Sequence, residues 1–313
     1  MSVNGLGEVQ NDANNSFQIL NKKNVTYLLT PSSCDEDTQL LLMISSGHDN
    51  HKARAQWRKR ISNLDQRVRH VFLVSLCDTC THDLTREHDT YHDIVHTSLL
   101  DGHRRLGYKI LSGYIWSYLN CHQAKYVAKT DDNVVIDLPR LIATVSSKSP
   151  DDKKVMCGCG PPHRNMKTLR SETPRMLGNW SVPKDQLESD IVPDFCAGFM
   201  YLVTPRLASK LAQAGFKVFG DHNDEIVLIE DSLITGVLRE SLGDVDLEIL
   251  VESSLSLVWT RFFSHCPWMT VAKMTFFDEL VLSKISDRSG VQYVGDIWTP
   301  GNYYSSTFLK LAC

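Results

Sequence analysis

The 313-residue sequence has no long hydrophobic run, no signal peptide and no excess of basic residues. Apolar stretches such as residues 195–203 fall far below the roughly 18 residues of a membrane-spanning helix. The N-terminus, MSVNGLGEVQNDANNS, lacks the basic and then apolar pattern of a secretory signal. Because 33 Lys and Arg are balanced by 37 Asp and Glu, we expect no nucleic acid partner. With 42% hydrophobic residues, the composition indicates a soluble globular protein.

Cysteine, in contrast, is abundant, with nine residues where a reducing compartment would favour few. The pairs Cys77/Cys80 and Cys157/Cys159 raise the possibility of zinc, but C-x-C is too short for a zinc knuckle. No thioredoxin pattern surrounds the C-x-x-C pair. Disulfides therefore fit better than zinc or a redox site; their connectivity stays open, and an odd number leaves at least one cysteine unpaired.

Apolar and charged segments alternate through the first 135 residues. Residues 1–23 are rich in Asn, Ser and Gly and predict a flexible leader or stem. The alternation beyond them predicts a Rossmann-like, mostly parallel sheet flanked by helices, which is an α/β fold. Strands are expected at 25–29, 40–45, 71–76, 125–130 and 134–136, and helices at 51–62 and 99–122.

The second half of the chain is more mixed. Residues 157–194 are rich in Pro, Gly and polar residues and predict a long irregular segment, which is typical of functional loops. Beyond it, strands are expected at 199–203, 247–251 and 255–259, and helices at 206–214 and 234–241. Since neither a repeat nor a linker divides the chain, we expect one domain from residue 24 to 313.

An acidic triplet, Asp131-Asp132-Asn133, directly follows the predicted strand at 125–130. Ligands of open α/β sheets bind outside the carboxyl ends of the strands. Oxygen ligands there suit Mg²⁺ or Mn²⁺, often with substrate phosphates completing the shell, and such a cation neutralises a diphosphate leaving group. A solvated turn is the alternative, because Asp and Asn favour turns for local reasons.

The residues around the triplet, CHQAKYVAKTDDNVVID at 121–137, resemble the core motif of glycosyltransferase family 31, the β-1,3-galactosyl- and N-acetylglucosaminyltransferases. The resemblance covers roughly residues 40–265, and the order and spacing of its motifs together are specific. Further matches, in the family's order, are Arg54 with Trp57, VFLVSL at 71–76, Glu87, Tyr91, Asp93 and Ile94, then Asp101, Leu106, Lys109 and Trp116, Trp180 with Val182 and Pro183, FCAGFMYLVT at 195–204, and Glu230 with Asp231.

This resemblance implies a GT-A-type fold with a nucleotide-sugar half at 24–137 and a mixed, acceptor-binding half at 138–313. It implies Mn²⁺-dependent, inverting transfer of galactose or an N-acetylhexosamine from a UDP-sugar to a glycan or glycoconjugate hydroxyl, in β-1,3 linkage. The alternative is an inactive relative that binds nucleotide or glycan as a scaffold or chaperone. A glycosidase is disfavoured, because the triplet suits a metal and a diphosphate better than an acid and a nucleophile.

The resemblance also assigns roles on the donor side. Asp131 and Asp132 would bind the donor, and Asn133 would coordinate the metal where the family usually has Asp. Because an amide oxygen ligates without charge, Asp132 would share the metal and the affinity would be lower than the family norm. His265 is expected as a further metal ligand. Arg54 would bind donor phosphate through its planar fork, its alternative being an ordinary surface arginine.

On the acceptor side, Asp231 is the expected base and Glu230 the runner-up. The alternative is that both acids simply favour the first turn of the following helix. Trp180 is expected to line the acceptor site, because sugars stack on aromatic faces; the alternative is a buried anchor for the irregular segment.

Members of the family are typically anchored in the Golgi membrane with a luminal catalytic domain. The resemblance begins near residue 40, so the preceding residues look like a stem. We therefore expect a luminal catalytic domain whose membrane anchor lies outside this sequence. The cysteines and three N-x-(S/T) sequons, at Asn14, Asn24 and Asn179, agree with that address.

Overall fold

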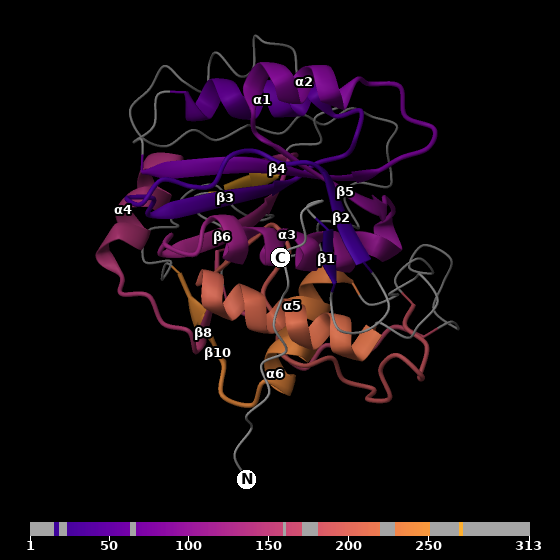
Figure 1. Cartoon of the computed structure of the whole chain (residues 1–313). Coiled ribbons are helices and arrows are strands. Elements are labelled where there is room, and N and C mark those ends of the chain that lie inside the picture. The colour runs from indigo at the N-terminus through magenta and orange to yellow at the C-terminus, as the bar shows by residue number, and fades with distance from the viewer. Residues whose placement is uncertain are drawn as a thin grey trace, which may run out of the picture.

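A computed structural model describes residues 16–18, 24–62, 67–158, 161–170, 181–219, 229–250 and 269–271. In it, helices cover both faces of one nine-stranded sheet (Figure 1). The strand order is β1 (Ser16–Gln18), β2 (Asn24–Leu29), β5 (Ile94–Leu100), β4 (Val68–Leu76), β3 (Leu40–Ser45), β6 (Tyr126–Asp131), β9 (Met200–Val203), β8 (Lys154–Cys157) and β10 (Asp246–Ile249). A second sheet pairs β7 (Val134–Ile136) with β11 (Met269–Val271).

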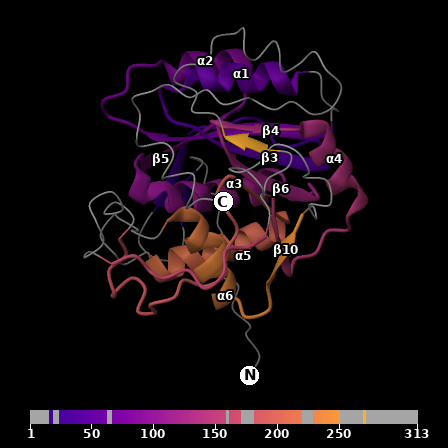
Figure 2. The same ribbon diagram turned by 180° about the vertical axis from the view of Figure 1, so that it is seen from behind.

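The helices form the two outer layers. They are α1 (His51–Ile61), α2 (Leu84–Tyr91), α3 (Leu106–Asn120), α4 (Leu138–Ser147), α5 (Pro205–Phe219), α6 (Arg239–Ser241), the 3₁₀ turn η1 (His103–Arg105) and the π-helical segment η3 (Ser232–Leu238). In Figures 1 and 2, α1 and α2 lie on one side of the sheet, and α3 and α5 on the other. None of the helices in the described ranges has the length and hydrophobicity needed to cross a bilayer.

Strand order reverses between β3 and β6. The four central strands β5, β4, β3 and β6 are parallel to one another. From β3 the chain passes through α1 to β4 and through α2 to β5, and then returns through α3 to the opposite side of β3. The carboxyl ends of β3 and β6 meet there, with Ser45 paired to Asp131. Such a reversal is where open α/β sheets bind their ligands.

Alternation along the strands divides the apolar residues into two cores. Residues such as Met43 and Leu73 point to the face covered by α3 and α5. Their neighbours Ile44 and Phe72 point to the face covered by α1, α2 and α4. Burial on both faces explains why these strands are continuous apolar runs in the sequence. Each fully buried side chain of this size contributes roughly 1.5–3 kcal/mol.

The predicted α/β architecture, a sheet flanked by helices, is confirmed. The strands expected at 40–45, 71–76, 125–130 and 134–136 and the helix at 51–62 are present within a few residues. The prediction of a helix starting at residue 99 was wrong: residues 94–100 form β5, and α3 starts at Leu106. The β-branched residues of IVHTSLL favour the extended strand. Residues 16–18, which the composition placed in the flexible leader, form β1 and pair with β2.

The second half of the chain extends the same sheet. β9 runs antiparallel to β6 and β8, and β10 runs parallel to β8. The described residues between β8 and β9 include two isolated bridges, His163 with Phe195 and Lys167 with Ile191, which agrees with the irregular segment expected there. The helix expected at 234–241 is present but largely π-helical. The strand expected at 255–259 lies outside the described residues.

The part of the chain that the structure describes contains three disulfides, and two of them close long segments. Cys34–Cys121 spans 87 residues, Cys157–Cys196 spans 39, and Cys77–Cys80 spans 3. These pairings rule out the zinc site that the sequence left as a weak alternative, because three of its four cysteines are disulfide-bonded.

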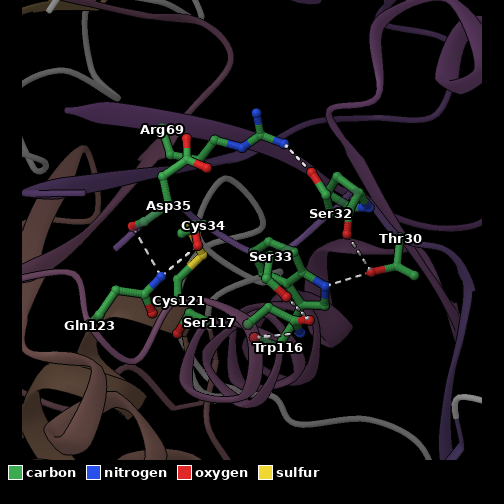
Figure 3. The surroundings of a disulfide bond; sticks show 12 residues. Thr30, Ser32, Ser33, Cys34, Asp35, Arg69, Trp116, Ser117, Cys121 and Gln123 are labelled. Atoms are coloured by element: carbon green, nitrogen blue, oxygen red, sulfur yellow. Dashed lines mark hydrogen bonds between the residues drawn. A yellow bond between two sulfur atoms is a disulfide. The ribbon is translucent and has the colours of Figure 1, made fainter. Parts of the chain in front are cut away.

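The Cys34–Cys121 disulfide joins the segment that leads into β3 to the segment that leads into β6 (Figure 3). The Gln123 side chain reinforces it, donating a 2.6 Å hydrogen bond to the Cys34 carbonyl. Trp116 of α3 donates to the Thr30 hydroxyl at 2.7 Å on the same side. The disulfide therefore couples the two strands whose carboxyl ends meet at the reversal.

We predict that replacing Cys34 and Cys121 by Ala lowers the free energy of unfolding by about 4–5 kcal/mol, because the unfolded chain loses an 87-residue closed loop. The matched control, Cys77→Ala/Cys80→Ala, opens a loop of only 3 residues and should cost about 2 kcal/mol. Denaturant titration of the three oxidised proteins measures both. Equal losses in the two variants would contradict the prediction.

Candidate functional site

The acidic triplet occupies the reversal point between β3 and β6. Because successive residues of extended chain point to opposite faces, Asp131 and Asp132 diverge. The Asp131 side chain is 32% exposed, whereas Asp132 is buried. Asp132 Oδ2 accepts hydrogen bonds from Ser46 Oγ at 2.7 Å and Asn50 Nδ2 at 2.9 Å. Asn133 is exposed in the turn that follows.

Asp132 fastens this turn to the loop that follows β3. Its backbone carbonyl accepts a hydrogen bond from Trp57 Nε1 of α1 at 3.0 Å, in addition to the two bonds at its carboxylate. Burial raises the pKa of Asp132, while the hydrogen bonds from Ser46 and Asn50 act in the opposite direction. The carboxylate therefore organises the loop as well as lying in the motif that the resemblance assigns to the donor.

The loop after β3 is held from beneath by Arg54, which is completely buried. Its Nε and Nη2 bind the Glu87 carboxylate at 2.9 and 2.7 Å. Nη1 donates to Ser46 Oγ at 3.0 Å and to the Gly47 carbonyl at 2.6 Å, and Nη2 donates to the His48 carbonyl at 3.0 Å. A guanidinium has five N–H donors, and these bonds use all of them. The structure therefore gives Arg54 the role of positioning the loop, in place of the expected contact with donor phosphate.

Glu87 is the centre of a buried charge network. Arg58 Nη1 lies 2.7 Å from its Oε1, and His82 Nε2 lies 2.7 Å from its Oε2. Arg58 also binds Asp93 at 2.7 Å. Burial alone would raise the pKa of Glu87, but Arg54 and Arg58 outweigh it and bring the pKa to about 2. In the sequence, Glu87 and Asp93 stood out only as matches to the family pattern, which implied no role for them.

The opposite face of the sheet carries a buried cation that sequence reasoning missed. Lys129 of β6 is only 1% exposed and lies on the same face as Asp131. Its Nζ donates to the Gly198 carbonyl at 2.7 Å and to Glu230 Oε2 at 2.9 Å, and lies 3.0 Å from Asp131 Oδ1. Burial would lower the pKa of Lys129, but Asp131 and Glu230 raise it above its usual value. In the sequence, this buried cation was visible only as a lysine within an apolar strand, close to the acids of the triplet.

Glu230 is anchored to the sheet through both carboxylate oxygens. Oε2 binds Lys129, and Oε1 accepts a hydrogen bond from the Tyr201 hydroxyl. Lys129 and Tyr201 are direct partners in the β6–β9 ladder, so their side chains share one face. Glu230 is itself buried. Its position is therefore fixed by two neighbouring strands.

Asp231 follows Glu230 in the chain and is the N-cap residue of the π-helical segment η3. Its Oδ2 accepts from the Gly198 amide at 2.9 Å, and its Oδ1 accepts from the Ser232 amide at 2.7 Å. A Cβ at Gly198 would lie only 3.0 Å from Asp231 Oδ2, so a side chain here would press on the Asp231 carboxylate. Burial, and then the neighbouring charge of Glu230, raise the pKa of Asp231 to about 7. Such a pKa is suited to general base catalysis near neutral pH.

The oxygen atoms at the end of β6 can hold a divalent cation only if water and substrate phosphates supply its other ligands. Among the residues that the structure describes, no three of His, Cys, Asp and Glu gather to hold a metal ion. The partly exposed Asp131 and the exposed Asn133 nevertheless present oxygen atoms at one strand end. Mg²⁺ and Mn²⁺ often use one or two protein oxygens together with water and substrate phosphates. His265 and Trp180, predicted for the metal and the acceptor, lie outside the described residues.

We predict that Glu87→Gln lowers the free energy of unfolding by about 3–5 kcal/mol, because Arg54 stays buried without its ionic partner. Denaturant titration at pH 7 checks this value. Glu248→Gln, at a half-exposed ion pair with Lys148, is the control and should cost about 0–1 kcal/mol.

The same variant changes the dependence of stability on pH. The pKa of Glu87 is about 2 in the folded protein and about 4.3 in an unfolded chain. Its stabilisation is therefore complete above the unfolded value and is lost as the pH falls towards 2. Between pH 7 and pH 3, the wild type should lose more stability than Glu87→Gln, and equal losses would be evidence against this charge network.

Known proteins resemble this chain over most of the described region. A family model described as Galactosyltransferase matches residues 51–249. Lactosylceramide 1,3-N-acetyl-beta-D-glucosaminyltransferase A of Danio rerio is 27% identical in an alignment of length 194 that covers 58% of this chain and 50% of that protein. Beta-1,3-galactosyltransferase 2 of Mus musculus is 25% identical in an alignment of length 249 that covers 72% of this chain and 57% of that protein. The chain thus spans about half the length of these relatives.

Solved structures are more distant. The galactosyltransferase LgtC, in complex with donor and acceptor sugar analogs, aligns over 67% of this chain and 72% of its own, with 8% identity and a TM-score of 0.32. The segment that the family model matches, in contrast, is more than half of the chain and includes the acidic triplet, Lys129 and Asp231. The chain belongs to the galactosyltransferase family, which is glycosyltransferase family 31.

Proposed function

We propose that this chain is an inverting glycosyltransferase that moves a hexose or N-acetylhexosamine from a UDP-sugar to a hydroxyl of a glycan or glycoconjugate, forming a β-1,3 linkage. Family membership supports the reaction class, and the names of two relatives specify 1,3-N-acetylglucosaminyl and β-1,3-galactosyl transfer. The observation that carries the proposal is the placement of Asp131 and the Glu230–Asp231 pair around one buried ammonium, at the strand reversal.

Inverting transfer needs a base on the acceptor side, opposite the departing nucleotide. Asp231 takes the proton of the acceptor hydroxyl on its carboxylate. The hydroxyl oxygen then forms a bond to the anomeric carbon as the bond from that carbon to the diphosphate oxygen breaks, releasing UDP. Asn133 and Asp131 would hold Mn²⁺, which would neutralise charge on the leaving diphosphate. Asp131 here takes the place expected for Asp132, because the Asp132 carboxylate is buried and already accepts hydrogen bonds from Ser46 and Asn50. Arg54 and Asp132 shape the loop beside the donor.

Asp231 is favoured over Glu230 as the base. Both oxygens of Glu230 are bound to Tyr201 and Lys129, and its side chain is buried. Asp231 is held only by backbone amides, which orient the carboxylate and leave lone pairs for a proton. The structural anchor and the reactive acid are therefore adjacent residues with different environments.

We also propose a luminal address in the Golgi. The three disulfides support it, because disulfides form and persist mainly in oxidising compartments.

We predict that the chain has a UDP site whose affinity depends on Mn²⁺. Asn133 offers an amide oxygen where an acid would add charge, so we expect UDP binding that depends on Mn²⁺ but is weak. Asn133→Asp should strengthen the metal-dependent part, because carboxylates bind hard cations more tightly than amides. Calorimetry with UDP, with Mn²⁺ at millimolar concentration and with chelator as the control, measures it. No Mn²⁺-linked binding in either protein would count against the metal assignment.

A further prediction concerns the base. Asp231→Asn should lower the rate of transfer by about 10²–10⁴-fold and leave UDP binding intact. In the wild type, transfer should rise with pH through about 7, because the base acts only when deprotonated. Asp244→Asn, at an exposed residue paired with Lys153, is the matched control and should keep full activity.

The assay uses a panel of sugar nucleotides with and without Mn²⁺. Undiminished turnover by Asp231→Asn would remove it as the base. Absence of turnover by the wild type with every donor, together with retained UDP binding, would instead favour the inactive scaffold, which Asn133 and the departures from the family pattern around Arg54 suggest.

A further inference from the structure

Lys129 joins three separate segments of the chain through one ammonium group. Its partners are Asp131 at the end of β6, the Gly198 carbonyl just before β9, and Glu230 just before η3. An ammonium has three N–H donors and no acceptor, so each donor has its own partner. The contacts to Gly198 and Glu230 lie 69 and 101 residues away in the sequence. Lys129 is therefore a junction and not a local strand contact.

The junction connects the two sides of the proposed reaction. Asp131 belongs to the donor-side triplet, whereas Glu230 precedes the base Asp231. Gly198 adds a second route, because its carbonyl accepts from Lys129 while its amide donates to Asp231 Oδ2 at 2.9 Å. The position of Asp231 relative to Asp131 is thus set through two independent contacts with a single side chain.

The cost of burying Lys129 indicates that its role is specific. A lysine that is 1% exposed has lost nearly all of its hydration, and only a complete set of acceptors compensates for that loss. An apolar residue of similar length would fill the same space without this cost, provided that Glu230 were neutral as well. The charged arrangement therefore adds geometry more than it adds stability.

We propose that Lys129 is the positioning residue of the transfer site: it fixes the distance and orientation between the donor-side carboxylate Asp131 and the base Asp231. This inference rests on the proposed glycosyl transfer. Lys129 is only 1% exposed, and it acts through Gly198 and Glu230 on the carboxylate that takes the proton.

A double variant separates positioning from folding. Lys129→Met alone leaves Glu230 buried without a cation, so we expect a large loss of stability. Lys129→Met/Glu230→Gln removes both charges, and its denaturant midpoint should return towards that of the wild type. The kcat of the double variant should nevertheless stay about 10²-fold low, because misplacement of a reacting group by about 1 Å costs that much. Its affinity for UDP, measured by calorimetry, should stay close to that of the wild type.

The matched control is Lys148→Met/Glu248→Gln, which removes a partly exposed Lys–Glu ion pair between the residue that follows α4 and β10, with Nζ and Oε1 2.6 Å apart. Its kcat and UDP affinity should equal those of the wild type. Recovery of both stability and kcat in the Lys129/Glu230 double variant would reduce Lys129 to a structural residue and overturn the inference, while the proposed function would stand. Absence of wild-type turnover with every sugar nucleotide would overturn both.

Discussion

The reversal of strand order between β3 and β6 is the constraint on which the rest of the site depends. It brings Ser45 and Asp131 together at the same edge of the sheet and leaves the loop after β3 facing the turn after β6. Neither segment would hold its shape alone, because both are short connections with polar backbone. Each is consequently tied down by side chains from another element, and the acidic triplet is where these ties meet.

Arg54 and Lys129, two of the buried cations that tie these segments down, act on opposite faces of the sheet. Arg54 supports the loop after β3 from the α1 side, and Lys129 links β6 to Glu230 on the α3 side. Each side chain is nearly inaccessible to water and meets a full set of acceptors. The alternation of residues along the strand end directs Asp132 to the first support and Asp131 to the second. A single acidic motif is thereby joined to two charge networks that do not share a side chain.

Much of the fold was predictable because a strand buried on both faces is an uninterrupted apolar run, as at Leu40–Ser45. β5 was missed although the dipeptide Asp101-Gly102, a turn signal, separates it from the segment that leads into α3. The triplet and Asp231 were recognised through their motifs. The roles of Arg54 and Lys129 were not, because their partners are 33 and up to 101 residues away. Local pattern identifies acids at strand ends, whereas the cations that orient them depend on tertiary pairing.

The Cys157–Cys196 disulfide gives the irregular segment between β8 and β9 two fixed ends. One end leaves the sheet at Cys157, and the other returns two residues before Gly198, which holds Asp231. A chain segment closed in this way tolerates insertions at little entropic cost, because loop-closure entropy grows slowly with length. The segment can therefore diverge in length and sequence while the reacting carboxylates keep their places. Sequence variation in this segment and the geometry of the acidic residues are in this sense separable properties of one domain.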